Sequence, residues 1–304
     1  MTAGEFPFVD AHVHLWDLAH IRYPWLTPPF DGNGPNGSVE AIARTYLLDD
    51  YLDDAGDWAP AGMVHIDAGA HPGDALKETR WLQHMADRRG LPSAIVGYAP
   101  LQDPDVERLL AAHTACPAVR GIRQIVNWHR DPARTYLSSD ITADPAWQAG
   151  FALLGKYGLS FDLQAYPGQF AGLARLIARH PGVPVIVNHA GMAVDRDAEG
   201  LESWRSGMRA LAALPNVFVK ISGVGFVFRP WTAGMVRDYV RETIDIFGAD
   251  RALFASDFPT DKLFGDFGRT LGAYDAATAD FTEGERRALF GRNADRVYRL
   301  GLGV

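Results

Sequence analysis

The amino-acid sequence predicts an α/β fold, a single-domain (β/α)8 TIM barrel over residues 1–304. Eight short apolar runs with strand-like composition recur along the chain, and helical patterns lie between them. This alternation indicates a parallel sheet, either doubly wound or closed into a barrel. The count of eight favours the barrel, as does the length of 304 residues, which matches about 250 residues plus an insertion.

The predicted strands are runs rich in Val, Ile, Leu and Phe, as expected for strands buried on both faces. They are Phe8–Trp16, Gly62–Gly69, Ala94–Leu101, Val119–Asn127, Leu159–Tyr166, Val183–Gly191, Val217–Val224 and Arg251–Pro259.

Helices are predicted where apolar residues recur at helical spacing between start and stop signals. Pro104 and Pro145 each follow an Asp at a helix start, and Thr282 and Glu285 form a capping box. The predicted helices are Ala75–Gly90, Asp105–Cys116, Pro145–Gly158, Gly168–His180, Trp204–Leu214, Thr232–Gly248 and Thr282–Arg292.

The segment 17–38 after the first strand is rich in aromatic residues and proline, and it is too long for a plain connector. We expect it to lie over the active-site face, with Trp25 contacting the substrate. The alternative is a disordered surface loop, but Tyr23, Trp25 and Phe30 argue against disorder.

Composition excludes several classes of function. The net charge of −8 argues against nucleic-acid and anionic-membrane partners. No apolar run approaches the ~20 residues needed to span a bilayer. With a single cysteine, Cys116, and a beginning unlike a signal peptide, a cytoplasmic protein with a small-molecule substrate is expected. The oligomeric state is left open.

His12 and His14 lie two apart in the first predicted strand. Side chains two apart on a strand point to the same side, so both imidazoles could hold one metal ion or one polarised substrate atom. The alternative is a pair of core histidines that hydrogen-bond to the backbone.

Other polar residues end the remaining strands, and the strand ends of a barrel converge on one mouth. His189 ends the sixth strand and Asp257 the eighth. Imidazoles with a carboxylate suit a divalent ion such as Zn²⁺, or Asp257 could activate water directly as a general base.

Candidate substrate-binding residues follow strands four and five. Arg123 could bind a substrate oxygen in a fork, or could form an internal ion pair with a carboxylate at the barrel mouth. Trp128 and Tyr166 could line the pocket or simply pack, and Gln164 is the inward-facing group of strand five.

These motifs resemble the amidohydrolase superfamily in its family 2 branch. The resemblance rests on His12-Val-His14, on His189 in Asn188-His-Ala-Gly191 and on Asp257 in Ser256-Asp-Phe-Pro259. Within the branch the chain is similar to sugar-lactone hydrolases of the fuconolactonase and rhamnonolactonase group. The sequences that carry this closer match are Asp10–Asp17, Tyr23–Leu26, Glu78–Leu82, Val119–Gln124 and Leu289–Ala294.

The resemblance implies a metal site of His12, His14 and Asp257, with His189 as a further ligand. Many members place a His or a modified Lys at the end of strand five, where this chain has Gln164, a poor zinc ligand. One divalent ion, Zn or Mn, is therefore expected rather than two. Some lactonases of the branch are thought to work without metal, so a metal-independent site stays open.

The activity implied is hydrolysis of a small lactone or related carboxylic ester. Asp257 would deprotonate water, while His12, His14 and His189 polarise the carbonyl and Arg123 holds the substrate. One alternative is a metal-dependent decarboxylase, which usually has a strand-five His as a metal ligand. The other is a non-catalytic small-molecule-binding barrel, which has no need for a convergent acid–base set.

Overall fold

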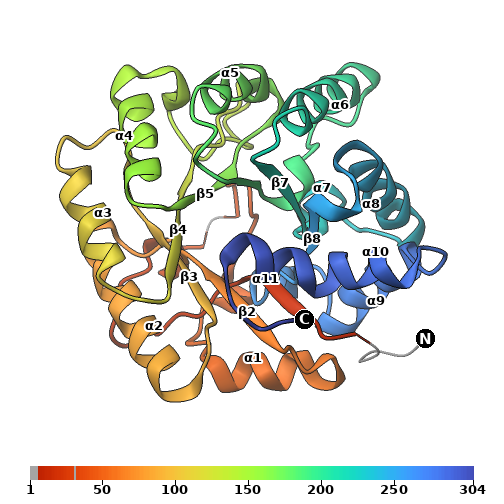
Figure 1. Cartoon of the computed structure of the whole chain (residues 1–304), viewed down its shortest axis with the longest axis horizontal. Helices are drawn as coiled ribbons and strands as arrows, with labels where there is room; N and C mark the ends of the chain where they lie inside the picture. The colour runs from red at the N-terminus through yellow and green to blue at the C-terminus, as the bar shows by residue number, and fades with distance from the viewer. Residues whose placement is uncertain (1–5, 31) are drawn as a thin grey trace.

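The computed structural model describes residues 6–30 and 32–304. Eight parallel strands follow one another around a single sheet in chain order, β1 to β8, which confirms the predicted (β/α)8 barrel (Figure 1). The strands are β1 Val9–Val13, β2 Gly62–Ile66, β3 Ala94–Tyr98, β4 Val119–Ile125, β5 Ser160–Gln164, β6 Val185–Val187, β7 Val217–Ile221 and β8 Ala252–Phe254.

Helices surround this sheet, and α11 lies across one end of the barrel (Figure 1). The helices are α1 Leu48–Ala55, α2 Ala75–Arg89, α3 Val106–Thr114, α4 Pro145–Lys156, α5 Pro167–Ala178, α6 Ala198–Ala212, α7 Val224–Val227, α8 Ala233–Phe247, α9 Phe267–Ala277, α10 Glu283–Arg287 and α11 Asn293–Tyr298. Over the ranges described, each helix is too short or too polar to cross a bilayer.

The ring closes between β1 and the residues just after β8. Asp257 donates its backbone N–H to the His12 carbonyl at 2.9 Å, and His14 donates its own to the Phe258 carbonyl at 2.8 Å. Val13 pairs with Phe258 in a parallel bridge. The closing hydrogen bonds therefore join the two stretches of chain that carry the predicted metal ligands.

The predicted strands are all present, but the structure ends several of them earlier. β6 ends at Val187 because His189 and Ala190 adopt positive φ angles of 54° and 48°, which no strand accommodates. The predicted helix from Thr282 continues through a π-helical turn, Ala288–Arg292, into α11. Helices α1, α7, α9 and α11 were not predicted. Four aspartates in α1 obscure its apolar pattern.

A buried ion pair joins two strands of the barrel. Lys220 on β7 contacts Asp162 on β5, and both side chains are fully buried. The Tyr298 hydroxyl of α11 donates to the same carboxylate, at 2.9 and 3.1 Å from its two oxygens. Burial lowers the pKa of Lys220 to about 8, and the Asp162 carboxylate opposes this shift.

We expect Lys220→Met to destabilise the fold by about 3–5 kcal/mol, because it leaves the Asp162 carboxylate buried without its cation. Urea denaturation measures the loss. The double variant Lys220→Met, Asp162→Asn removes both charges and should recover most of it. A single variant as stable as the wild type would show that the pair does not hold the barrel interior together.

Candidate active site

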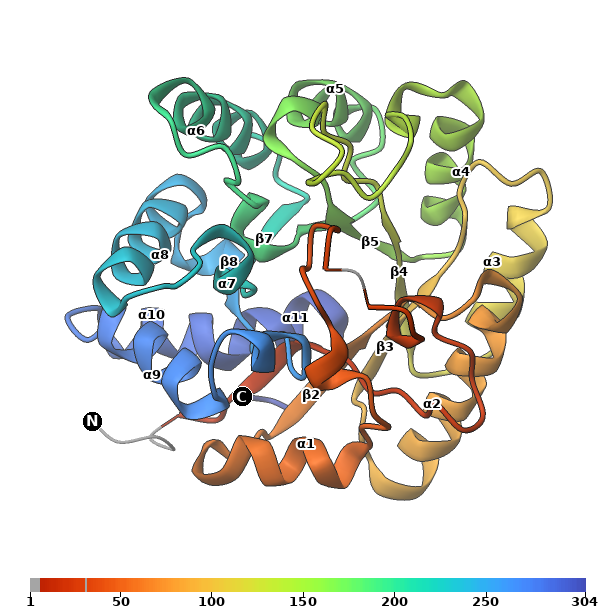
Figure 2. The same cartoon turned by 180° about the vertical axis from the view of Figure 1, so that it is seen from behind.

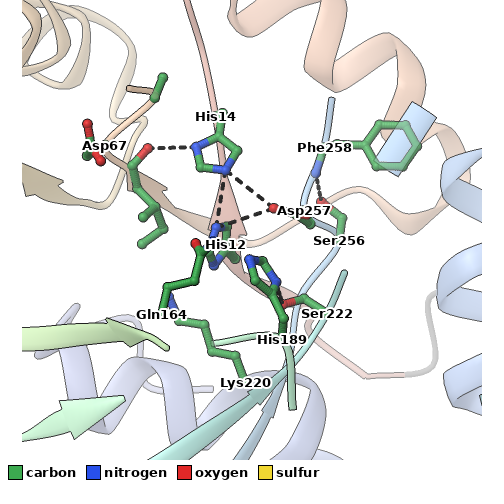
Figure 3. Close-up of polar contacts among 12 residues, drawn as sticks. His12, His14, Asp67, Gln164, His189, Lys220, Ser222, Ser256, Asp257 and Phe258 are labelled. Carbon is green, nitrogen blue, oxygen red and sulfur yellow. Dashed lines mark hydrogen bonds and ion pairs between the residues drawn. The ribbon is translucent and has the colours of Figure 1, made fainter. Parts of the chain in front are cut away.

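The candidate site lies at the carboxyl end of the strands, where three elements bring their side chains together (Figure 3). His12 and His14 come from β1 and its end, Asp257 follows β8, and His189 follows β6. All four side chains are buried. The structure thus brings together every residue that the sequence predicts as catalytic.

A bulge in β1 turns His12 toward this site. Asp10 pairs with Met63 but Val13 pairs with His65, so β1 has one residue more than β2 between the two pairs. Ala11 packs in the cluster inside the barrel, and strict alternation would then point His12 outward. The extra residue re-aims the side chain, as bulges beside active sites commonly do.

Three donor atoms of His12, His14 and Asp257 form a nearly equilateral triangle. The two histidine Nε2 atoms are 3.2 Å apart, and each lies 3.3 Å from Oδ1 of Asp257. A tetrahedral zinc site with bonds of about 2.0–2.1 Å has ligand–ligand separations of about 3.3–3.4 Å. The triangle therefore has the dimensions of one face of a tetrahedral metal site, and these residues fit one divalent ion.

Hydrogen bonding fixes which atom of His14 faces the triangle. Nδ1 lies 2.8 Å from the Ile66 carbonyl, which only accepts, so Nδ1 carries the proton. Burial lowers the pKa of His14 to about 3, so its Nε2 presents a bare lone pair to the Asp257 carboxylate. Two acceptors facing each other at 3.3 Å repel, and a cation between them would remove the repulsion.

His189 stands beside this triangle and is not part of it. Its ring centroid lies 4.8 Å from that of His12, and its Nδ1 is 3.0 Å from the Ser222 hydroxyl. Burial lowers the pKa of His189 to about 4, so the ring is neutral. It lines the cavity and lies outside the cluster of His12, His14 and Asp257.

Asp10 positions the site, although in the sequence it stands out only as part of a motif. Its carboxylate accepts hydrogen bonds from the backbone N–H of Ser256 at 2.9 Å and of His12 at 3.3 Å, and from the Tyr51 hydroxyl at 3.0 Å. These bonds hold the residues before Asp257 against β1. An aspartate inside an apolar strand is the signal, because a buried carboxylate requires donors.

Arg123 both forms an internal ion pair and lines the cavity. Its Nε lies 3.2 Å from Oδ2 of Asp67, and its Nη2 donates to the Asp67 carbonyl. Its Nη1 donates to Oε1 of Gln164 at 3.1 Å. The guanidinium charge is therefore balanced within the protein wall, while its remaining N–H groups are left for a ligand.

A cavity of about 230 Å³ opens above these groups. Residues 17–30 and 32–38 cross the mouth of the barrel (Figure 2) and supply Trp25 and Asn36 to the lining. Trp25 donates its indole N–H to the Ala68 carbonyl at 2.8 Å. The lining residues are His14, Trp25, Asn36, Ala68, Gly69, Arg123, Ile125, Tyr136, Gln164, His189, Phe226, Asp257 and Thr260.

The structure places Trp128 and Tyr166 outside this lining. The Trp128 side chain is 38% exposed, and the Tyr166 hydroxyl donates to the Arg134 carbonyl at 2.6 Å. Conversely, Asn36, Tyr136 and Phe226 line the cavity without having been singled out in the sequence. Asn36 and Tyr136 lie in connecting segments and Phe226 in the four-residue helix α7, so no periodicity indicates which way these side chains point.

Gly223, just after β7, leaves the space that His189 occupies. A Cβ at this glycine would lie 2.5 Å from Nδ1 of His189, and its φ of +59° is one that other residues rarely adopt. The sharp turn after β7 therefore requires glycine both for its backbone conformation and for the position of the histidine.

Comparisons with known proteins show what this chain is similar to. A family model described as Amidohydrolase matches residues 9–300. The protein y4mH of Sinorhizobium fredii, described as uncharacterized, is 44% identical over 98% of this chain and 100% of its own length. The L-fucono-1,5-lactonase of Burkholderia ambifaria is 30% identical over 96% of this chain and 95% of its own.

A solved structure shares the fold over nearly the whole chain. It is an amidohydrolase from Burkholderia multivorans with bound zinc, with a TM-score of 0.79 and 25% identity. The match covers 96% of this chain and 99% of that one.

We expect zinc-loaded protein to hold one ion per chain, because the triangle offers one set of three donors. His14→Ala should weaken zinc binding by at least about 100-fold, measured by competition with a chromogenic chelator. His84→Ala, an exposed histidine on α2, is the matched control. Two tightly held ions per chain, or unchanged affinity in His14→Ala, would contradict this site.

Gly223→Ala should destabilise the fold by about 1–3 kcal/mol more than Gly90→Ala, because it adds a clash to the backbone strain. Gly90 also has a positive φ, +72°, but nothing lies within 4 Å of its added Cβ. Urea denaturation of both variants isolates the clash. Equal losses would mean that His189 moves aside without cost.

Proposed function

The chain belongs to amidohydrolase family 2, and on this premise we propose that it opens a small uncharged lactone by attack of a water that Asp257 activates. The observation that carries the proposal is the environment of Asp257. Its Oδ1 faces the two histidines, whereas Oδ2 is buried and has no partner among the described residues. A carboxylate oxygen held this way can accept a proton from a water in the cavity.

The cavity lining supports water as the nucleophile. It contains no Ser, Cys or Lys among the described residues, and its hydroxyls are those of Tyr136 and Thr260. Neither hydroxyl has a histidine hydrogen-bonded to it that would activate it for attack, within the chain as described. A covalent acyl-enzyme therefore has no evident nucleophile, and direct hydrolysis is favoured.

The reaction then follows from the positions of the residues. Asp257 takes a proton from water, and the resulting hydroxide attacks the lactone carbonyl carbon. Arg123 and His189, which face the same cavity, are placed to contact the developing oxyanion. The carbon–oxygen bond of the ring then breaks, and the ring oxygen takes back the proton held by Asp257, which yields a hydroxy acid.

A divalent ion fits this scheme without being required by every step. His12, His14 and Asp257 would hold it, and when bound it would polarise the carbonyl and acidify the water. The two histidines contribute no charge of their own, because burial lowers the pKa of each well below its usual range.

The charge balance favours a lactone over the carboxylic acid of a decarboxylase. Arg123 is the only Lys or Arg among the described lining residues, and it is already paired with Asp67. A carboxylate substrate would meet the Asp257 charge without a free cation to offset it. The relative named L-fucono-1,5-lactonase supports the same choice of substrate class.

We expect the wild type to hydrolyse members of a lactone panel, and Asp257→Asn to lower kcat by about 10²–10⁴-fold, because the amide cannot accept the proton. A pH-stat assay follows acid release, and zinc content is measured alongside to separate loss of the base from loss of metal. Asp238→Asn, exposed on α8, is the control. Near-wild-type turnover in folded Asp257→Asn, or decarboxylation with no lactone opened, would overturn the proposal.

A further inference from the structure

Asn36 is a polar residue of the cavity to which the mechanism above gives no role. It lies in the segment 17–38 that crosses the mouth, and it lines the same cavity as Asp257. The Tyr136 hydroxyl, from the segment after β4, donates to Oδ1 of Asn36 at 2.5 Å. This bond joins two connecting segments that lie about a hundred residues apart in the chain.

The bond to Tyr136 determines which end of the Asn36 amide is available. Because Oδ1 is occupied, the free end is Nδ2, whose two N–H groups have no partner among the described residues. Burial raises the pKa of Tyr136, so its hydroxyl keeps its proton and remains a donor. The bond to Tyr136 therefore orients the Asn36 amide, with Nδ2 as the end that can donate to a ligand in the cavity.

Two contacts hold the part of the chain that precedes Asn36. Arg229, after α7, donates to the Pro35 carbonyl at 2.8 Å. Toward the start of the segment, Arg22 pairs with Asp74 through two hydrogen bonds of 2.8 and 2.9 Å. A donor on a tethered segment loses little conformational freedom when it binds a ligand, so its hydrogen bond adds more to affinity.

Gln164 on β5 is a second carboxamide of the lining whose oxygen accepts a hydrogen bond from the protein. Its Oε1 accepts from Arg123 at 3.1 Å, which leaves its amide nitrogen as the free end in the cavity lining. Two carboxamides thus present donors, while Trp25 and Phe226 present apolar ring surfaces. A ligand that satisfies this lining carries oxygen acceptors around a compact ring.

We propose that Asn36, oriented by Tyr136, is a specificity-determining residue that donates a hydrogen bond to a ring-hydroxyl oxygen of the substrate. The inference rests on the proposed lactone hydrolysis and narrows its substrate class to hydroxylated lactones. An unsubstituted lactone leaves the Asn36 donor desolvated and unpaired, which costs binding free energy.

Binding of inert lactams tests the inference without relying on turnover. The probes are a panel of epimeric polyhydroxylated 1,5-lactams and unsubstituted δ-valerolactam, titrated by calorimetry. The wild type should bind its best hydroxylated lactam at least about 10-fold more tightly than δ-valerolactam. Asn36→Leu, similar in shape but without donors, should lose about 10-fold on the hydroxylated probe and change less than about twofold on δ-valerolactam.

Tyr136→Phe provides the second variant, because it keeps Asn36 but frees its amide to turn. Tyr136→Phe should also weaken binding of the hydroxylated lactam, but by less than Asn36→Leu does. Ser38→Ala, an exposed residue of the same segment, is the matched control and should bind both probes as the wild type does. Melting temperatures confirm that each variant is folded.

The outcomes separate this inference from the proposed function. Equal losses on both probes in Asn36→Leu, or a wild type that does not prefer any hydroxylated lactam, would overturn the role of Asn36 even if lactones are hydrolysed. If no lactone is hydrolysed but Asn36→Leu still loses its preference for the hydroxylated lactam, the proposed reaction fails and the role of Asn36 in recognition stands.

Discussion

The seam between β1 and the residues after β8 is the constraint on which the site depends. Two backbone hydrogen bonds and the Asp10 carboxylate hold His12, His14 and Asp257 in one register. A slip of one residue along this seam would turn Asp257 to the other face of the sheet. The closure of the barrel thus positions the backbone of these residues, and this position sets the spacing of the three donor atoms.

Two buried carboxylates near this seam are paired with cations, whereas neutral donors hold Asp10 and the two histidines face Asp257. Lys220 faces Asp162 inside the barrel, and Arg123 faces Asp67 in the cavity wall. The histidines are neutral because burial disfavours their charged forms. The cavity therefore carries the negative charge of one carboxylate, which attracts a cation to the site and disfavours an anionic substrate in the absence of one.

Periodic features of the sequence predicted the barrel and which polar side chains meet at its mouth, because strand ends in a barrel converge. The geometry of His12 required a bulge, which alternation does not reveal. The sequence also did not predict the contacts between connecting segments. Asn36 and Tyr136 meet only through the tertiary fold, whereas Trp128, predicted as a lining residue, lies outside the cavity lining and is partly exposed.

The position of the three donor atoms in the chain has a consequence for how a metal ion would be taken up. His12 and His14 lie in the first strand and Asp257 follows the last, so unfolded or partly folded chains lack the assembled cluster. An ion bound there stabilises the closed ring selectively, and the free energy of unfolding rises with the logarithm of free metal concentration. Metal binding and folding would then be thermodynamically linked, and a bound ion would indicate a chain whose barrel has closed.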